Sequence, residues 1–102
     1  PRAAALVRGK DLPPEEARGF VEHIMAIQRT LPRARGVQDV DVQQVAGRIY
    51  LAFHLILDPD LSIDEVHAAA EEMENQLRRD FPQLGRVMIH TEPHGAAHRT
   101  GP

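Results

Sequence analysis

The chain has 102 residues, a formal charge of −3, and 42% hydrophobic and 26% charged residues, which is the composition of one ordinary globular domain with an aliphatic core. It has no cysteine, which excludes disulfides, thiolate metal sites and thiol nucleophiles. Acidic and basic residues are interspersed, so nucleic acid and anionic lipid are not expected partners.

The first predicted element is a helix that begins within residues 11–16. Pro13 and Pro14 are tolerated in a first turn, and the glutamates that follow complement the helix dipole there. Pro32 and Gly36 end the helix. Its apolar stripe recurs every three or four residues and comprises Ala17, Phe20, Val21, Ile24, Ile27 and Leu31.

Two strands are expected next. Residues 37–45 alternate imperfectly, with Val40 and Val42 on one side and Asp39 and Asp41 on the other, as in a half-solvated strand. Residues 46–48 form a short turn, and residues 49–57 form a second, mostly apolar strand. Strands joined by so few residues pair antiparallel, so the two form a hairpin.

A second helix and a third strand complete the pattern. Ser62 and Glu65 match a capping box, and Leu61 and Val66 are spaced as a hydrophobic staple. Pro82 ends the helix, and residues 87–91 form the third strand. The predicted apolar face of the helix comprises Ile63, Val66, Ala70, Met73, Leu77 and Phe81.

The order helix, strand, strand, helix, strand predicts an α+β fold, a two-layer sandwich with a three-stranded mixed sheet. A right-handed crossover through the second helix places the third strand parallel to the second and beside it. Both helices should cover the face that carries Leu51, Phe53 and Leu55, which leaves the other face of the sheet without a helix.

The uncovered face carries the candidate chemistry. Side chains alternate along a strand, so His54 points away from the Phe53 stripe, and His90 and Glu92 share one face of the third strand. Two imidazoles and a carboxylate on one surface are ligands for borderline cations. Divalent metal binding is therefore the first functional hypothesis.

The remaining histidines have simpler explanations by periodicity alone. His67 lies on the flank of the second helix's apolar stripe, where packing against the core is the ordinary role. His94 and His98 are spaced four apart beyond the third strand, and we treat them as an accessory site at most. His23 lies at the edge of the first helix's stripe and has no obvious ligand neighbour in the sequence.

Other polar residues favour a solvated surface. Asp39 and Asp41 could be ligands, but a solvated strand face is the simpler interpretation. Glu74 and Arg78 have the spacing of a helical ion pair. The sequence shows no Gly-rich phosphate loop, nucleophile elbow or HExxH pattern, so we expect no enzyme activity and no catalytic residues.

Residues 12–93 nevertheless resemble a known family, the cytoplasmic C-terminal domain of cation diffusion facilitator transporters. Several short motifs in the right order are far more specific together than any one of them. The resemblance is carried by Leu12-Pro13-Pro14-Glu15-Glu16, Gly36-Val37-Gln38-Asp39-Val40, Phe53-His54-Leu55, Asp58-Pro59-Asp60-Leu61-Ser62, Glu65-Val66-His67, Phe81-Pro82 and Ile89-His90-Thr91-Glu92-Pro93.

The resemblance implies a metallochaperone-like αββαβ fold that forms a homodimer beneath a transmembrane zinc/proton antiporter. It also implies metal ligands at His54, His67, His90 and Glu92. The chain departs from the family at Gln38, where many zinc-transporting members have histidine, so a reduced metal site is expected. Zn²⁺ is the expected cation, while Cd²⁺, Co²⁺, Ni²⁺, Mn²⁺ and Fe²⁺ stay open because imidazole and carboxylate accept them all.

We therefore expect a regulatory and dimerisation domain at the cytoplasmic face of a cell membrane, itself soluble, joined to a parent transmembrane domain. Residues 1–11 would be the linker from that membrane part, residues 12–93 the domain, and residues 94–102 a flexible tail. Two alternatives stay open. The chain could be a stand-alone metal-binding or metallochaperone-like protein of the same fold, or a small α+β module that dimerises or binds an organic ligand, with no metal role.

Overall fold

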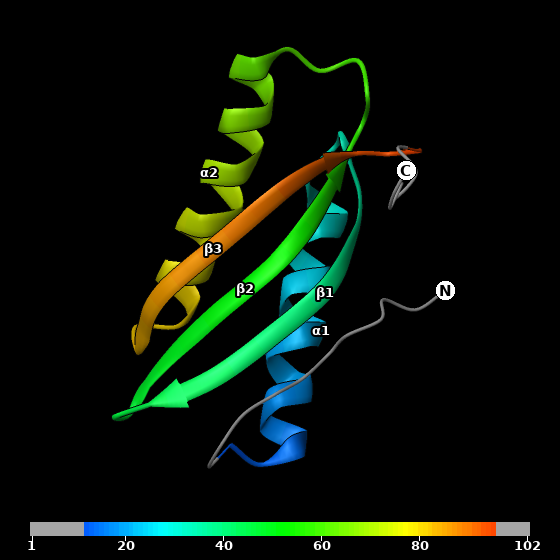
Figure 1. The fold of residues 1–102 in the computed structure, drawn as a ribbon. Helices are drawn as coiled ribbons and strands as arrows, with labels where there is room; N and C mark the ends of the chain where they lie inside the picture. Colours follow the sequence, from blue (N-terminus) through cyan, green and yellow to red (C-terminus); the bar gives the residue numbers. More distant parts are fainter. Residues whose placement is uncertain (1–11, 96–102) are drawn as a thin grey trace, which may run out of the picture.

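A computed structural model describes residues 12–95, so the expected linker of residues 1–11 and the tail position His98 lie outside the described residues. The expected order of elements is confirmed, and β1 and β3 are longer than the sequence pattern indicated (Figure 1). The elements are α1 (Pro14–Thr30), β1 (Ala34–Val45), β2 (Arg48–Leu57), α2 (Ile63–Asp80) and β3 (Leu84–Pro93).

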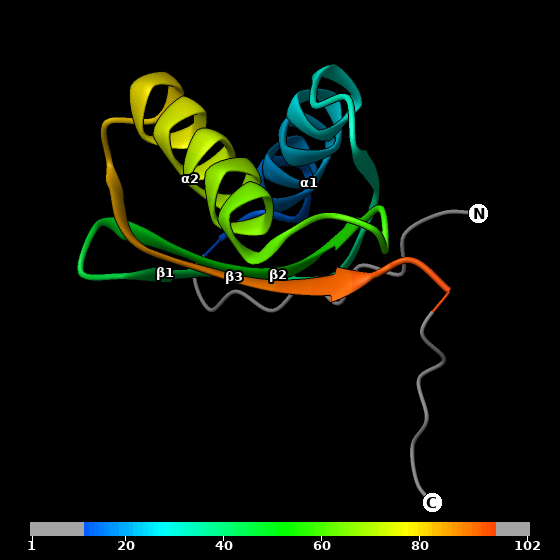
Figure 2. The same ribbon diagram turned by 90° about the horizontal axis from the view of Figure 1, so that it is seen from above.

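The sheet has the strand order β1-β2-β3, with β1 antiparallel and β3 parallel to the central β2. Both helices lie on one face of this sheet, and Figure 2 shows that no helix lies below it within the described chain. The crossover through α2 therefore has the predicted result. The two-layer α+β sandwich with a mixed sheet is confirmed.

The core lies between the helices and the sheet. Phe53 and Leu55 of β2 are 1% and 0% exposed, and Ile24 of α1 and Met73 of α2 are fully buried against the same layer. Their burial follows the periods of 3.6 and 2 residues that the sequence shows. The other buried hydrophobic residues on this side include Ala17, Phe20, Val21, Ile27, Val40, Val42, Leu51, Leu57 and Leu77.

A two-residue turn joins β1 to β2. Val45 pairs with Arg48, and the two residues between them have positive φ angles, 52° at Ala46 and 79° at Gly47. This pattern is that of a type I′ turn, whose twist matches that of the flanking strands. The hairpin is thus confirmed, although Ala46 occupies a left-handed position that favours asparagine or glycine.

The start of α2 confirms one prediction and corrects another. Ser62 accepts a hydrogen bond from the backbone N–H of Glu65, whose side chain accepts one from the Ser62 N–H, so the capping box is present. Ile63 was expected on the buried face of the helix, but it is 74% exposed. Figure 1 shows the reason: the first turn of α2 extends beyond the ends of the strands, where there is no sheet to cover it.

Candidate functional site

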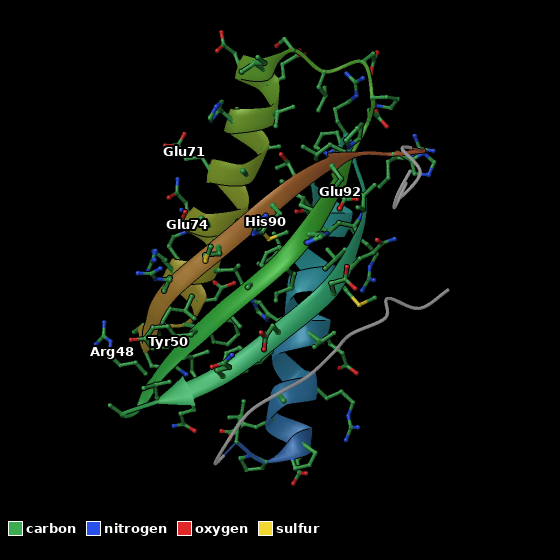
Figure 3. All side chains as sticks on the ribbon, viewed as in Figure 1. Arg48, Tyr50, Glu71, Glu74, His90 and Glu92 are labelled. Carbon is green, nitrogen blue, oxygen red and sulfur yellow. The ribbon has the colours of Figure 1, made fainter. Side chains whose placement is uncertain are left out.

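The candidate site lies on the face of the sheet opposite the helices. His54 of β2 and His90 of β3 are register partners in the parallel ladder, and Glu92 follows two residues later on the same side of β3. The predicted alternation is therefore observed on both strands. Figure 3 shows His90 and Glu92 along β3, with the open face of the sheet toward the viewer.

The two imidazoles and the carboxylate form a compact cluster. The ring centroids of His54 and His90 are 5.3 Å apart, with their planes inclined by 41°. Nδ1 of His54 lies 2.7 Å from Oε2 of Glu92. The side chains of His54 and Glu92 are 33% and 26% exposed, so the cluster is partly open to solvent.

A second carboxylate approaches the same nitrogen. Oδ2 of Asp39 lies 3.6 Å from Nδ1 of His54. Among the described residues, Nδ1 has no hydrogen-bond partner although the atom itself is buried. The direction of the 2.7 Å contact with Glu92 therefore does not suit a hydrogen bond.

The donor types suit a divalent cation, but the side chains would have to move to hold one. Ligand atoms about 2.1 Å from a tetrahedral zinc ion lie roughly 3.4 Å apart, close to the Asp39–His54 spacing of 3.6 Å. The 2.7 Å between Glu92 and His54 is shorter. As the side chains stand, residues 12–95 contain no group of three or more metal-ligating residues arranged around one point. A cation would replace the present contact between Glu92 and His54.

His67 lies apart from this cluster, although it belongs to the ligand set that the resemblance implied. It is exposed on α2 and lines a hollow of about 310 Å³ with Glu71, Glu74 and Ile89. Ile89 belongs to the helix-facing side of β3, opposite His90. Figure 3 shows Glu71 and Glu74 on the flank of α2 that points away from β1. One copy of the chain does not bring His67 together with His54 and His90.

His23 has a partner that the sequence did not reveal. Its Nε2 lies 2.6 Å from Oδ2 of Asp80, and its ring packs edge-on against Phe81 with centroids 4.6 Å apart. The hydrogen bond from His23 holds the pKa of the Asp80 carboxyl below its ordinary value. These contacts join α1 to the end of α2, so we assign His23 to the structure of the helix layer.

A second network lies at the end of the sheet where β2 leaves for α2. Arg33 contacts Asp58 and Asp60, and Arg35 donates a hydrogen bond to the other oxygen of Asp58 at 2.8 Å. The hydrogen bond from Arg33, and then that from Arg35, lowers the pKa of the Asp58 carboxyl. The network ties the start of β1 to the loop before α2 and takes no part in the histidine cluster.

The family of the chain follows from comparison with known proteins. A model of the family described as "cation efflux protein, cytoplasmic domain" matches residues 14–94. The chain belongs to this family. The family is one of cation transporter domains and not a class of enzymes, and the resemblance noted from the sequence motifs is confirmed.

Two curated relatives of this cation efflux domain are bacterial pumps. The chain is 31% identical over 82 residues to the cation-efflux pump FieF of Pectobacterium atrosepticum, covering 80% of this chain and 26% of the pump. It is 29% identical over 72 residues to FieF of Shewanella oneidensis, covering 71% of this chain and 24% of the pump. The chain thus spans about a quarter of the length of these relatives.

Solved structures of the family agree with the fold. The zinc form of CzrB, a protein proposed to be a zinc transporter, superposes with a TM-score of 0.68 at 36% identity, covering 86% of this chain and 96% of that one. A variant of MamM superposes with a TM-score of 0.69 at 16% identity, covering 76% and 95% of the two chains, and shows the fold alone. The metallochaperone-like architecture is therefore confirmed. No helix within residues 12–95 has the length and apolar character needed to cross a membrane.

Proposed function

We propose that this cation efflux domain senses divalent metal and regulates proton-coupled metal efflux by a parent transporter. The observation that carries the proposal is the cluster of His54, His90 and Glu92 on the uncovered face of the sheet, in a chain of this family. Imidazole nitrogen and carboxylate oxygen are ligands that zinc accepts. The zinc form of the related CzrB supports zinc as the first cation to test.

The position of the cluster supports a site shared between two copies of the chain. His54, His90 and Glu92 supply at most three ligands from one copy, whereas His67 lies on the α2 flank of the molecule. A second copy that presents His67 to the cluster would add a ligand that one copy does not bring there. Tyr50 and Met88, which are 36% and 44% exposed on the same open face, offer apolar surface for such a homodimer.

The switch then follows from differential affinity. If two domains complete the ligand shell only when they approach, the closed pair binds the cation better, and its population rises with metal concentration. Without the cation, Asp39 and Glu92 place negative charge near the shared face and disfavour close approach of two copies. A bound divalent cation neutralises that charge.

The membrane part of the proposal rests on the relatives. The chain matches only about a quarter of each FieF pump, so the transmembrane domain, its antiport activity and residues 1–11 as the connecting linker are inferred from the family. Without such a membrane part, the same site would make the chain a stand-alone metal-binding protein.

Isothermal titration of Zn²⁺ into the metal-free domain tests the proposal, with sedimentation of the same samples reporting dimerisation. We expect saturable binding at a defined number of sites per subunit, coupled to closer association of two copies, and loss of both in His54→Ala. Gln43→Ala, on the open face of β1, is the matched control. Weak, non-saturating heat would contradict metal sensing and would favour a domain that only dimerises.

A further inference from the structure

Asp39 has the most unusual backbone position in β1. Between the register pairs Gln38↔His54 and Asp41↔Ala52, β1 has two residues and β2 has one, so β1 carries a β-bulge. Asp39 adopts a left-handed conformation there, with a φ of 53°. Aspartate is one of the few non-glycine residues that tolerate this region, and bulges of this kind re-aim a side chain.

The bulge directs the Asp39 carboxylate toward the histidine cluster. In an unbroken strand, Asp39 would point to the core side with Val37, because Gln38 already occupies the open face opposite His54. Instead, its Oδ2 lies 3.6 Å from Nδ1 of His54, and its side chain is 58% exposed. The extra residue also keeps Val40 in the core, where it is 0% exposed. The bulge therefore serves the core and the cluster at once.

We propose that Asp39 is a ligand of the divalent cation at the His54, His90 and Glu92 cluster, an inference that rests on the function proposed above. A second carboxylate brings the ligand charge to −2 and balances the cation, which the neutral amide of Gln38 cannot do. Nδ1 of His54 has no hydrogen-bond partner and lies 3.6 Å from Asp39 and 2.7 Å from Glu92, so small side-chain movements would let both carboxylates and the imidazole face one cation. Asp39 thus takes over the ligand role for which the neighbouring Gln38 is poorly suited.

The absence of cysteine from the chain permits a direct test of contact at position 39. In Asp39→Cys, a thiolate that touches bound Co²⁺ gives an intense near-ultraviolet charge-transfer band, whereas a residue that only orients His54 gives none. Gln43→Cys, on the same strand and further from His54, is the matched control. We expect the band in Asp39→Cys and none in Gln43→Cys. Equal bands in the two variants would overturn the assignment, and so would the absence of a band from an Asp39→Cys variant whose circular dichroism and stability match those of the unchanged chain.

The Zn²⁺ affinity of further variants gives a second test of Asp39 as a ligand. Asparagine keeps the size of the side chain and tolerates positive φ, so Asp39→Asn should leave the metal-free fold unchanged while it weakens Zn²⁺ binding about tenfold or more. Gln38→Ala should bind as the unchanged chain does, and Gln38→His should restore affinity to Asp39→Asn. Asp39→Gly separates backbone from carboxylate, because glycine keeps the bulge without the ligand.

The outcomes separate this inference from the proposed function. If the unchanged chain binds Zn²⁺ and Asp39→Asn and Asp39→Gly bind it equally well, Asp39 is not a ligand and the sensing function stands. If the unchanged chain binds no cation, both the proposed function and the role of Asp39 are wrong. If Gln38→Ala weakens binding as much as Asp39→Asn does, Gln38 holds the position that we assign to Asp39.

Discussion

The two faces of the one sheet have opposite characters. On the helix side, Leu51, Phe53 and Leu55 are at most 2% exposed, whereas Tyr50 and Met88 on the other side are 36% and 44% exposed. The open side also carries the histidine cluster. Because side chains alternate, neighbouring residues of β2 belong to different environments. The comparison teaches that one strand can carry the stability of the domain on one face and its chemistry on the other.

The largest effect on stability should come from substituting a residue of the buried face, and its neighbour on the open face should behave differently. Phe53→Ala removes a fully buried ring and should destabilise the domain by about 3–5 kcal/mol, a large part of the stability of a domain of this size. His54→Ala removes a half-exposed side chain and should cost less than about 1 kcal/mol while it abolishes metal binding. Urea unfolding at one fixed protein concentration measures both. Similar losses in the two variants would contradict the division.

The open face should also divide into residues that bind metal and residues that do not. His90→Ala should weaken Zn²⁺ binding about tenfold or more, because His90 is the register partner of His54. His94→Ala should change it much less, since His94 lies beyond the end of β3 and its backbone N–H bonds to the carbonyl of Leu57. Titration calorimetry compares the two, and equal losses would contradict the assignment of His90.

The stability contributed by Asp58, in the loop that follows β2, should depend on pH. Its pKa is lowered in the folded state, chiefly by the hydrogen bond from Arg33 and then by that from Arg35. Its ion pairs therefore stabilise the fold fully above the ordinary aspartate pKa of about 4, and that contribution is lost as the pH falls through the lowered value.

Asp58→Asn should accordingly unfold at a lower urea concentration than the unchanged chain at pH 7, and the two midpoints should converge in acid. Glu72→Gln, at an exposed position of α2, controls for a general effect of lost charge. A difference between Asp58→Asn and the unchanged chain that persists into strong acid would show that Asp58 stabilises the fold by other means.

Much of the division between the faces could be predicted from the sequence, because it depends on period alone. Alternation in β2 and β3 is enough to put His54, His90 and Glu92 on one side, and the crossover rule is enough to make β2 and β3 neighbours. The capping box of α2 is equally local. These features follow from residues close together in the chain, so the sequence carries them directly.

The features that could not be predicted depend on three-dimensional geometry that the spacing of residues along the chain does not determine. The bulge at Asp39 breaks the alternation by one residue, so that Asp39 follows Gln38 toward the open face while Val40 stays in the core, and the carboxylate approaches His54. His23 and Asp80 are 57 residues apart and meet only because α1 and α2 pack side by side. Ile63 fits the helical stripe, but the sheet ends before it.

The smallest expected effect separates the stability of the sheet from the chemistry of its open face. Ala46 holds a φ of 52° at the first position of the β1–β2 turn, where asparagine is preferred. Ala46→Asn should therefore stabilise the domain by about 0.5–1 kcal/mol. Gly47→Ala, at a φ of 79°, should destabilise it by about 1–2 kcal/mol and is the matched control.

Both turn variants should bind Zn²⁺ with unchanged affinity, since the turn lies at the far end of β2 from the histidine cluster. Thermal unfolding and titration of the same samples measure the two properties. A change in affinity that follows the change in stability would mean that the geometry of the cluster depends on the stability of the whole sheet. Unchanged affinity would mean that the bulge and the local register position the ligands, and that the helix-covered face contributes only a rigid support.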